Sequence, residues 1–228
     1  MKTKTHTPAL ILAFVSVFTV ATSSWGTSSA QTRRSRGGTS CLQSFVNLVS
    51  TNPDNWVHPV YIKELVLDAS PPSMRQHAGS IAHAVAAEVV RHQVDPLLVL
   101  ALIRQESNFH PHVVGAGLYY GLMQVHPSTG RNSLGNRSLR NRDLLNIETN
   151  IAAGVATLGL MRDQYARYPE SIAYVLLAYA MGDGRLEQLR RSGTPICGYL
   201  ATAERRYREL LSRLPADFER GGWQIALD

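Results

Sequence analysis

Hydrophobic positions recur every three or four residues along most of this chain, which is the spacing of an amphipathic α-helix. Strand patterns are scarce. The segments that carry the helical spacing are 41–50, 61–70, 80–92, a run from Pro96, 147–158, 172–181 and 199–210. We therefore expect an all-α, mainly helical fold.

The run that begins at Pro96 is the most hydrophobic of these segments. Asp95 precedes it, and an Asp cap followed by Pro is a strong helix start. Every residue from Leu97 to Ile103 is apolar, so nearly every face of the helix is apolar. Such a helix belongs at the centre of a fold.

Capping residues and prolines suggest the remaining boundaries. Ser171 is expected to cap the helix that runs to Met181, and Gly182 is expected to end it. Residues 31–40 are polar, basic and glycine-bearing, which is typical of a linker. We expect a linker and helical N-terminal extension over 31–73, a compact helical domain over 74–214 and a C-terminal tail over 215–228.

The N-terminus has the features of a secretory signal peptide. Lys2 and Lys4 precede the apolar run 9–21, and small residues with an expected cleavage site at Ala30 follow. The run is shorter than the roughly 20 residues that a spanning helix needs. We expect a signal peptide at 1–30 and an exported protein; an uncleaved membrane anchor is the alternative.

Composition limits the function classes. The chain of 228 residues has 23 Lys and Arg against 17 Asp and Glu, a mild excess of +6. It has no basic stripe interleaved with aromatics, no zinc-ligand spacing and no glycine-rich phosphate loop, so we expect no nucleic acid, metal or cofactor. In an oxidising compartment Cys41 and Cys197 could pair, and two separate thiols are the alternative.

A single acid, Glu106, closes the central apolar run. On a helix it shares a face with Val99, Leu102 and Ile103, so its carboxylate should be partly desolvated and its pKa raised. The C-terminal end of the helix dipole acts in the same direction. A surface ion pair with Arg104 or another Arg is the alternative. If desolvated, Glu106 can donate a proton near neutral pH.

The segment that follows Glu106 contains no Asp or Glu before Asp143. It holds glycines, prolines, paired tyrosines and the tetrad from Gly121 to Gln124, which is loop composition with a neutral, hydrogen-bonding lining. One acid among amides, hydroxyls and aromatic surfaces suits an uncharged ligand such as a sugar.

Together these motifs resemble the lytic transglycosylases that contain the soluble-lytic-transglycosylase domain. Four motifs occur in the order and spacing of that family over roughly residues 75–210, and their combination is specific. The motif residues are Glu106-Ser107-x-Phe109-x-Pro111; Gly121-Leu122-Met123-Gln124-Val125 with Pro127-Ser128-Thr129; Asn150-Ile151-x-x-Gly154 with Leu158; and Ala178-Tyr179 before Gly182-x-Gly184.

The resemblance implies a lysozyme-like domain with a substrate cleft for bacterial peptidoglycan glycan strands. It implies one acid, Glu106, which protonates the bond between N-acetylmuramic acid and N-acetylglucosamine and then helps to close a 1,6-anhydro ring. With the expected export signal, the protein would be periplasmic or in the cell envelope, and a cell-envelope or secretion complex is a further expected partner. Wall turnover, a secretion apparatus and attack on another cell all stay open as its role.

Site roles come from the same resemblance. Ser107 would orient Glu106, Met123 and Gln124 would line a sugar subsite, and Tyr179 would hydrogen-bond near the acid. Structural alternatives stay open: Ser107 bonded to its own helix, Met123 filling core space, Tyr179 as a buried aromatic.

Two departures from the family pattern modify these expectations. Gly115, Leu118 and Tyr119 stand where many members have a Ser and a Gly-Ala pair, so Tyr119 and Tyr120 would form an aromatic rim, with Tyr120 as a substrate contact. The Asn usual near the last motif is absent from Tyr179-Ala180-Met181.

Two other functions remain open. A hydrolytic muramidase would require a second acid or a positioned water, and Asp143, Glu148 and Asp183 are the available acids. A non-catalytic peptidoglycan-binding module is the third possibility.

Overall fold

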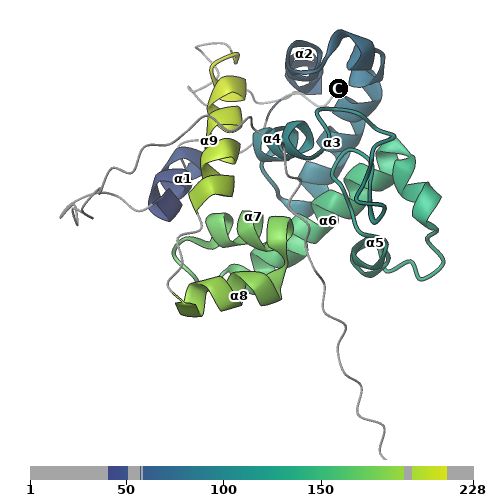
Figure 1. Ribbon diagram of the computed structural model, residues 1–228. Helices are drawn as coiled ribbons and strands as arrows, with labels where there is room; N and C mark the ends of the chain where they lie inside the picture. The colour runs from purple at the N-terminus through teal and green to yellow at the C-terminus, as the bar shows by residue number, and fades with distance from the viewer. Residues whose placement is uncertain (1–40, 51–56, 58, 193–196, 215–228) are drawn as a thin grey trace, which may run out of the picture. The chain divides into compact units, whose positions relative to one another are not determined.

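The computed structural model describes residues 41–50, 57, 59–192 and 197–214, and these residues are mostly helical (Figure 1). They belong to one compact unit that begins at Thr39. In chain order the elements are α1 Cys41–Ser50, α2 Pro59–Ala69, the 3-10 helix η1 Pro72–His77, α3 Ala78–His92, α4 Pro96–Glu106, β1 Val114–Gly115, β2 Tyr119–Tyr120, α5 Pro127–Ser133, the 3-10 helix η2 Asn141–Leu145, α6 Ile147–Tyr165, α7 Ser171–Met181, α8 Asp183–Ser192 and α9 Cys197–Leu211.

Helix α4 is the central element, as its apolar run predicts. Every residue from Pro96 to Ile103 is buried. Asp95 caps the helix, because its Oδ1 accepts hydrogen bonds from the N–H groups of Leu97 at 2.7 Å and Leu98 at 3.4 Å. The helix packs mainly against α9, and also against α3 and α2 (Figure 1).

Helix α9 returns beside α4 from the far end of the described chain. The hydroxyl of Tyr207 donates to the second oxygen of Asp95 at 2.5 Å, and both residues are buried. The Asp95 carboxylate therefore caps α4 and also accepts a hydrogen bond from the second half of α9, so it joins the two helices.

The long helix α6 packs against α3, α5 and α7. Asn146 caps it by accepting a hydrogen bond from the N–H of Thr149 at 2.9 Å. Small residues on its buried face, Ala153, Gly154 and Gly159, allow neighbours to approach closely. A side chain at Gly154 would collide with Met123, so this glycine admits the loop that follows the central helix.

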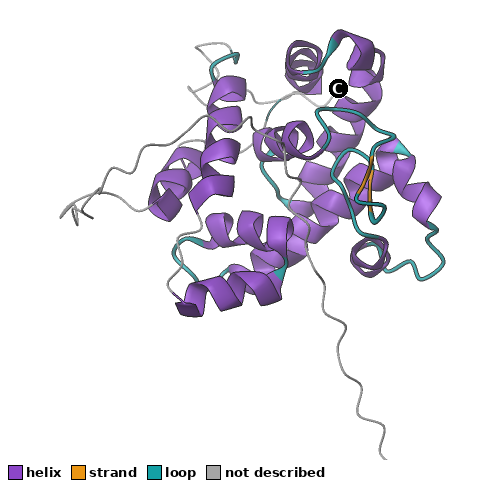
Figure 2. Ribbon diagram, viewed as in Figure 1, coloured by secondary structure: helices purple, strands orange, loops and turns teal. Residues whose placement is uncertain are grey.

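A two-stranded antiparallel hairpin, β1–β2, lies between α4 and α5 and is drawn in orange in Figure 2. It pairs Val114 with Tyr120 and Gly115 with Tyr119. The turn between the strands contains Ala116 and Gly117, both with positive φ. The sequence pattern did not predict this hairpin, because each strand has only two residues.

The predicted helices are confirmed, with shifts at their ends. Helix α6 continues to Tyr165, and the helices α5 and α8 were not predicted. Gly182 ends α7, as expected, with φ of 79°. The prediction that Ser171 caps α7 is wrong: Ser171 is its first helical residue, and Glu170 holds the cap position without a side-chain hydrogen bond.

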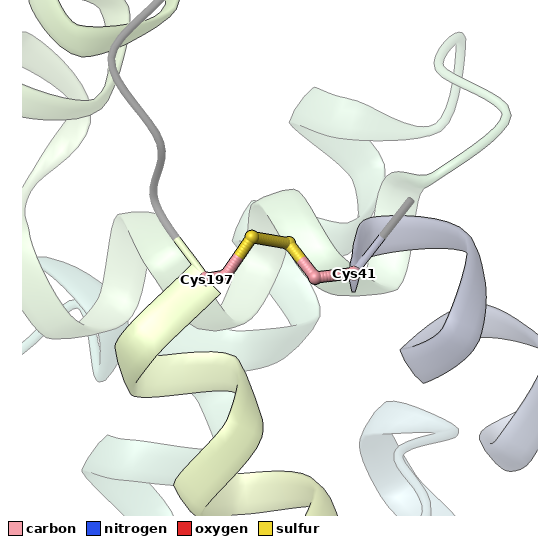
Figure 3. Close-up of a disulfide and its surroundings, with 2 residues drawn as sticks. All are labelled: Cys41 and Cys197. Atoms are coloured by element: carbon pink, nitrogen blue, oxygen red, sulfur yellow. A yellow bond between two sulfur atoms is a disulfide. The ribbon is translucent and has the colours of Figure 1, made fainter. Parts of the chain in front are cut away.

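Cys41 and Cys197 form a disulfide, so of the two alternatives the pairing is observed (Figure 3). The bond joins the first residue of α1 to the first residue of α9 across 156 positions of sequence. In a chain-entropy description, closing a loop of that length in the unfolded chain stabilises the fold by roughly 5 kcal/mol.

Helix α1 packs against α9 and α2 packs against α3, so the section before residue 74 contacts the rest of the unit. The expected signal peptide at 1–30, the linker up to residue 40 and the tail at 215–228 lie outside the described residues. Among the helices that are described, none is long and apolar enough to cross a membrane.

Candidate functional site

Glu106 is the last residue of α4 and is partly buried. The residues one and two turns before it, Val99, Leu102 and Ile103, are fully buried. Its Oε1 accepts a hydrogen bond of 2.8 Å from the hydroxyl of Tyr199, which lies in the first turn of α9. The acid is therefore held at the junction of the two packed helices.

Burial raises the pKa of Glu106 above its ordinary value. The hydrogen bond from Tyr199 and the positive charge of Arg206 act in the opposite direction and lower that pKa. Desolvation is the largest of these effects, so the protonated acid persists to higher pH than that of an exposed glutamate. This is the state that a general acid requires.

The alternative surface pairing of Glu106 with Arg104 is not observed. The guanidinium of Arg104 instead donates to Glu209 of α9 in a salt bridge. This leaves the Glu106 carboxylate with a phenol, rather than a guanidinium, as its hydrogen-bond partner.

Two tyrosines face the acid from different helices. Burial and the nearby charge of Glu106 raise the pKa of Tyr199 on α9 and of Tyr179 on α7 well above the ordinary value, so both phenols remain protonated donors. The Tyr179 hydroxyl donates to the backbone carbonyl of Met123 at 2.8 Å. Tyr179 thus lies near Glu106, as the motif implies, and it joins α7 to the loop that carries Met123.

The chain turns sharply after Glu106. Ser107 is buried, and its hydroxyl donates to the carbonyl of Ile103 at 3.1 Å, the helix-bonding alternative considered for this residue. Asn108 and Phe109 then adopt positive φ values of 49° and 64°, and Phe109 is fully buried. An orienting role of Ser107 toward Glu106 would therefore act through the helix end rather than by a direct hydrogen bond.

Asn150 of α6 fixes the loop from Gly121 to Gln124 beside the helices. Its Oδ1 accepts from the N–H of Met123 at 2.8 Å, and its Nδ2 donates to the carbonyls of Tyr120 and Leu144, both at 2.7 Å. A Cβ at Gly121 would lie 2.5 Å from Asn150 Nδ2, and the φ of Gly121 is 71°. This close contact and the positive φ therefore require glycine at the first position of the tetrad.

The predicted sugar contacts occupy different positions in this loop. The Met123 side chain is fully buried, with its sulfur against Gly154, which is the core-filling alternative. Gln124 is partly buried, and its Nε2 donates to the carbonyls of Gly121 at 2.8 Å and Val113 at 3.3 Å. Its Oε1 lies where a Cβ of Gly115 would stand, so this glycine makes room for the amide.

The tyrosines of the expected aromatic rim are both partly buried. The hydroxyl of Tyr120 accepts a long hydrogen bond, 3.5 Å, from Asn141 of η2. The Tyr119 ring meets the His126 ring edge-on, with centroids 5.7 Å apart. Contact of Tyr120 with a substrate stays a prediction.

Tyr199 is the residue that sequence reasoning missed. It was assigned only to the apolar face of the last helix, together with Ala203 and Tyr207. The spacing of eight residues between the two tyrosines could have indicated more, because it places two phenols on one face of α9. In the structure they contact the acids at the two ends of α4, Glu106 and Asp95.

No group of His, Cys, Asp and Glu that could hold a metal ion occurs within the described residues. The acids considered for a hydrolytic mechanism have other surroundings. Asp143 accepts from the Arg140 guanidinium, which holds its pKa below the ordinary value, and Asp183 accepts from the Tyr165 hydroxyl. Glu148 is exposed in the first turn of α6.

Comparison with known proteins supplies an independent finding. Residues 83–194 match the sequence profile of the Transglycosylase SLT domain. A membrane-bound lytic murein transglycosylase C of Histophilus somni (strain 2336) is 35% identical over 103 residues, 41% of this chain and 28% of the relative. An endo-type membrane-bound lytic murein transglycosylase A of Klebsiella pneumoniae (strain 342) is 36% identical over 102 residues, 41% of this chain and 50% of the relative. The chain thus matches at most half the length of these relatives.

Proposed function

Because this chain carries a transglycosylase SLT domain, as its motifs predict, we propose that it is a peptidoglycan lytic transglycosylase with Glu106 as its catalytic acid and base. The observation that carries the proposal is the environment of Glu106. A single carboxylate ends a helix that is buried from Pro96 to Ile103, burial raises the pKa of this carboxylate, and the Tyr199 hydroxyl donates a hydrogen bond to one of its oxygens.

The first step transfers a proton from Glu106 to the oxygen of the glycosidic bond between N-acetylmuramic acid and N-acetylglucosamine. The bond to the muramic acid C1 breaks, and the N-acetylglucosamine portion leaves with the proton on its oxygen. The acetamido carbonyl of the muramic acid stabilises the positive C1, as in substrate-assisted glycosidases. The raised pKa of Glu106 supports this step, because it favours the protonated form that donates the proton.

The second step returns the proton. The ionised Glu106 accepts the proton of the C6 hydroxyl, and the C6 oxygen bonds to C1 to form the 1,6-anhydro ring without water. The Tyr199 hydroxyl stabilises the ionised carboxylate during this step, because it donates a hydrogen bond to Oε1. The same residue therefore acts as acid and then as base.

The loop from Gly121 to Gln124 has a supporting role in this proposal. Asn150 and Tyr179 bind its backbone at Met123 from α6 and α7, so the loop is held in a defined position near the acid. We propose that Gln124 and Tyr120 reach the sugar from this loop, and that Met123 and Ser107 act by packing and by holding the end of α4.

Export to the periplasm or cell envelope follows from the same proposal, since its substrate is the bacterial wall. The names of both relatives include the term membrane-bound. The expected signal peptide at 1–30 would carry the chain across the inner membrane. We propose that its role is in wall turnover or in a secretion complex of the cell envelope.

Product analysis tests the function. The chain from residue 31 onward is incubated with purified sacculi, and soluble products are separated by chromatography and mass spectrometry. The wild type should release muropeptides with 1,6-anhydro ends. Glu106→Gln should lose at least about a hundredfold in rate, because it removes the acid while keeping the side-chain shape.

Glu209→Gln is the matched control, since it also neutralises a glutamate near the end of α4 but contacts Arg104 rather than Tyr199. It should keep activity, and both variants should keep the helical far-UV circular dichroism of the wild type. Reducing ends instead of anhydro ends would point to hydrolysis. Binding to sacculi with no soluble product from the wild type would point to a wall-binding module.

A further inference from the structure

We propose that the Cys41–Cys197 disulfide positions Tyr199, and through it Glu106, so that reduction of this bond uncouples the acid from its phenol. The cysteines are positioning residues in this proposal, and neither contacts the substrate. The effect on turnover rests on the proposed function. The effect of the disulfide on the hydrogen bond between Tyr199 and Glu106 can be measured on the protein alone.

The bond lies at the start of the helix that carries the phenol. Cys197 is the first residue of α9, and Tyr199 follows two positions later in the same turn. The Cα atoms of Cys41 and Cys197 are 5.7 Å apart, and Figure 3 shows the bond joining the two helix ends. A displacement of Cys197 would therefore be transmitted directly to Tyr199.

Helix α1 gives the disulfide a firm attachment. Phe45, Leu48 and Val49 of this helix are buried in the core. A weaker polar contact also joins the helices, in which the Ser44 hydroxyl donates to Glu204 of α9 at 3.4 Å. The disulfide is the covalent part of this connection.

The rest of α9 has attachments of its own. From Leu200 onward its buried residues are Leu200, Ala203, Tyr207 and Leu210, and Tyr207 donates to Asp95. The first N–H groups of any helix lack intrahelical partners, so a helix start frays more readily than its middle. Breaking the disulfide should therefore loosen mainly the turn that contains Tyr199, while the second half of α9 stays on α4.

The charged and titratable groups that face Glu106 in the described chain come from two helices. Tyr199 and Arg206 belong to α9 and Tyr179 belongs to α7. Arg104, on the same helix as the acid, forms a salt bridge with Glu209. Arg206 lies beyond the first turn of α9, so its influence should remain after reduction, whereas the Tyr199 hydrogen bond should weaken.

The sign of the effect follows from these contacts. The Tyr199 hydrogen bond lowers the pKa of Glu106, so losing it should raise that pKa further. Loss of a hydrogen bond to a charged group corresponds to a shift of about one pKa unit. The alkaline limb of the activity profile should move to higher pH by the same amount, because the first step needs the protonated acid.

The direct test is a carboxyl ¹³C NMR titration of glutamate-labelled protein, with the Glu106 resonance assigned by Glu106→Gln. Reduced wild type and Cys197→Ser should each show the upward shift, and so should Tyr199→Phe, which keeps the disulfide. Combining Cys197→Ser with Tyr199→Phe should add nothing further. Ser44→Ala, which removes the hydrogen bond from Ser44 of α1 to Glu204 of α9, should titrate like the oxidised wild type.

Turnover is measured on the same samples. Reduction should lower kcat at neutral pH about tenfold or more with KM nearly unchanged, because the Glu106 carboxylate is less well positioned and the second step loses the Tyr199 hydrogen bond to the ionised acid. Reoxidation should restore kcat. An unchanged Glu106 titration on reduction would overturn the proposal. Loss of the folded helical spectrum on reduction would overturn it too, because the acid and the phenol would then separate by global unfolding and not by loosening of the first turn of α9. An inactive wild type that still shows the coupling would refute the proposed function alone.

Discussion

Replacing Gly154 by Ala tests the packing that sets the loop beside α6. A Cβ at this position would lie 2.3 Å from Met123 Sδ, 2.8 Å from its Cε and 2.9 Å from its Cβ. The sulfur and methyl of a free methionine could swing away, but Met123 is fully buried. Its Cβ can retreat only if the backbone moves, and that backbone is held by Asn150 and Tyr179.

The magnitude is the difference of two effects. Ala in a helix interior is favoured over Gly by about 0.5–1 kcal/mol. Overpacking a filled core costs about 1–3 kcal/mol. We expect a net loss of about 1–2 kcal/mol in the free energy of unfolding. For a protein of this size that is a fall of roughly 2–8 °C in Tm.

Gly79→Ala is the matched control. Gly79 also lies in a helix, but nothing stands within 4 Å of its added Cβ. This variant should be neutral or stabilised by up to about 1 kcal/mol. Urea unfolding monitored by circular dichroism measures both variants, and the peptidoglycan assay shows whether the displaced loop also lowers turnover.

A double-mutant cycle isolates the collision. Met123→Ala alone should cost about 2–5 kcal/mol by leaving a cavity. In the Gly154→Ala background it should cost about 1–2 kcal/mol less, because the new methyl fills part of that space. If Gly154→Ala is as stable as the wild type, or if the two changes are additive, the contact does not constrain the loop as described.

Two further predictions concern stability. Burial raises the pKa of Asp95 to about 6 from an unfolded value of 3.8, so the folded state holds its proton more tightly. The free energy of unfolding should therefore fall by up to about 3 kcal/mol as pH rises from about 4 to 6 and level off above, and Asp95→Asn should flatten that slope in unfolding titrations. Gly121→Ala combines a positive φ with a Cβ 2.5 Å from the Leu144 carbonyl, so it should cost at least about 2 kcal/mol in thermal unfolding; a stable variant would contradict the loop geometry.

Local patterns predicted the helices because their causes are local. The Asp95 cap, the proline after it and the apolar run determine α4 within a few residues of sequence. Helix α8 was missed because only Leu186 of its residues is buried, so it has almost no hydrophobic period. The start of α7 was predicted one residue too late, which is within the usual precision of a helix boundary.

The site was predictable only in part. The SLT domain expected from the motifs matches residues 83–194, and an elevated pKa of Glu106 follows from the apolar residues of its own helix. Its phenol partner, Tyr199, lies 93 residues away, and a pattern within one segment cannot report such a contact. A hydroxyl or an amide can form many hydrogen bonds, so the sequence alone does not identify the partners of Ser107 and Gln124. In the structure both side chains donate to backbone carbonyls, which the fold brings near them.

The pairing of α4 with α9 has a consequence for the order in which the chain becomes functional. The hydroxyl that donates to Asp95 comes from Tyr207, 112 residues later in the chain. The hydroxyl that donates to Glu106 comes from Tyr199, 93 residues later. A nascent or clipped chain that ends before residue 197 would contain all four family motifs and yet lack the element that holds the acid. Synthesis of α9, its docking on α4 and oxidation of Cys197 would therefore complete the site, and the proposed activity would arise only after the chain has been made at least to the end of α9.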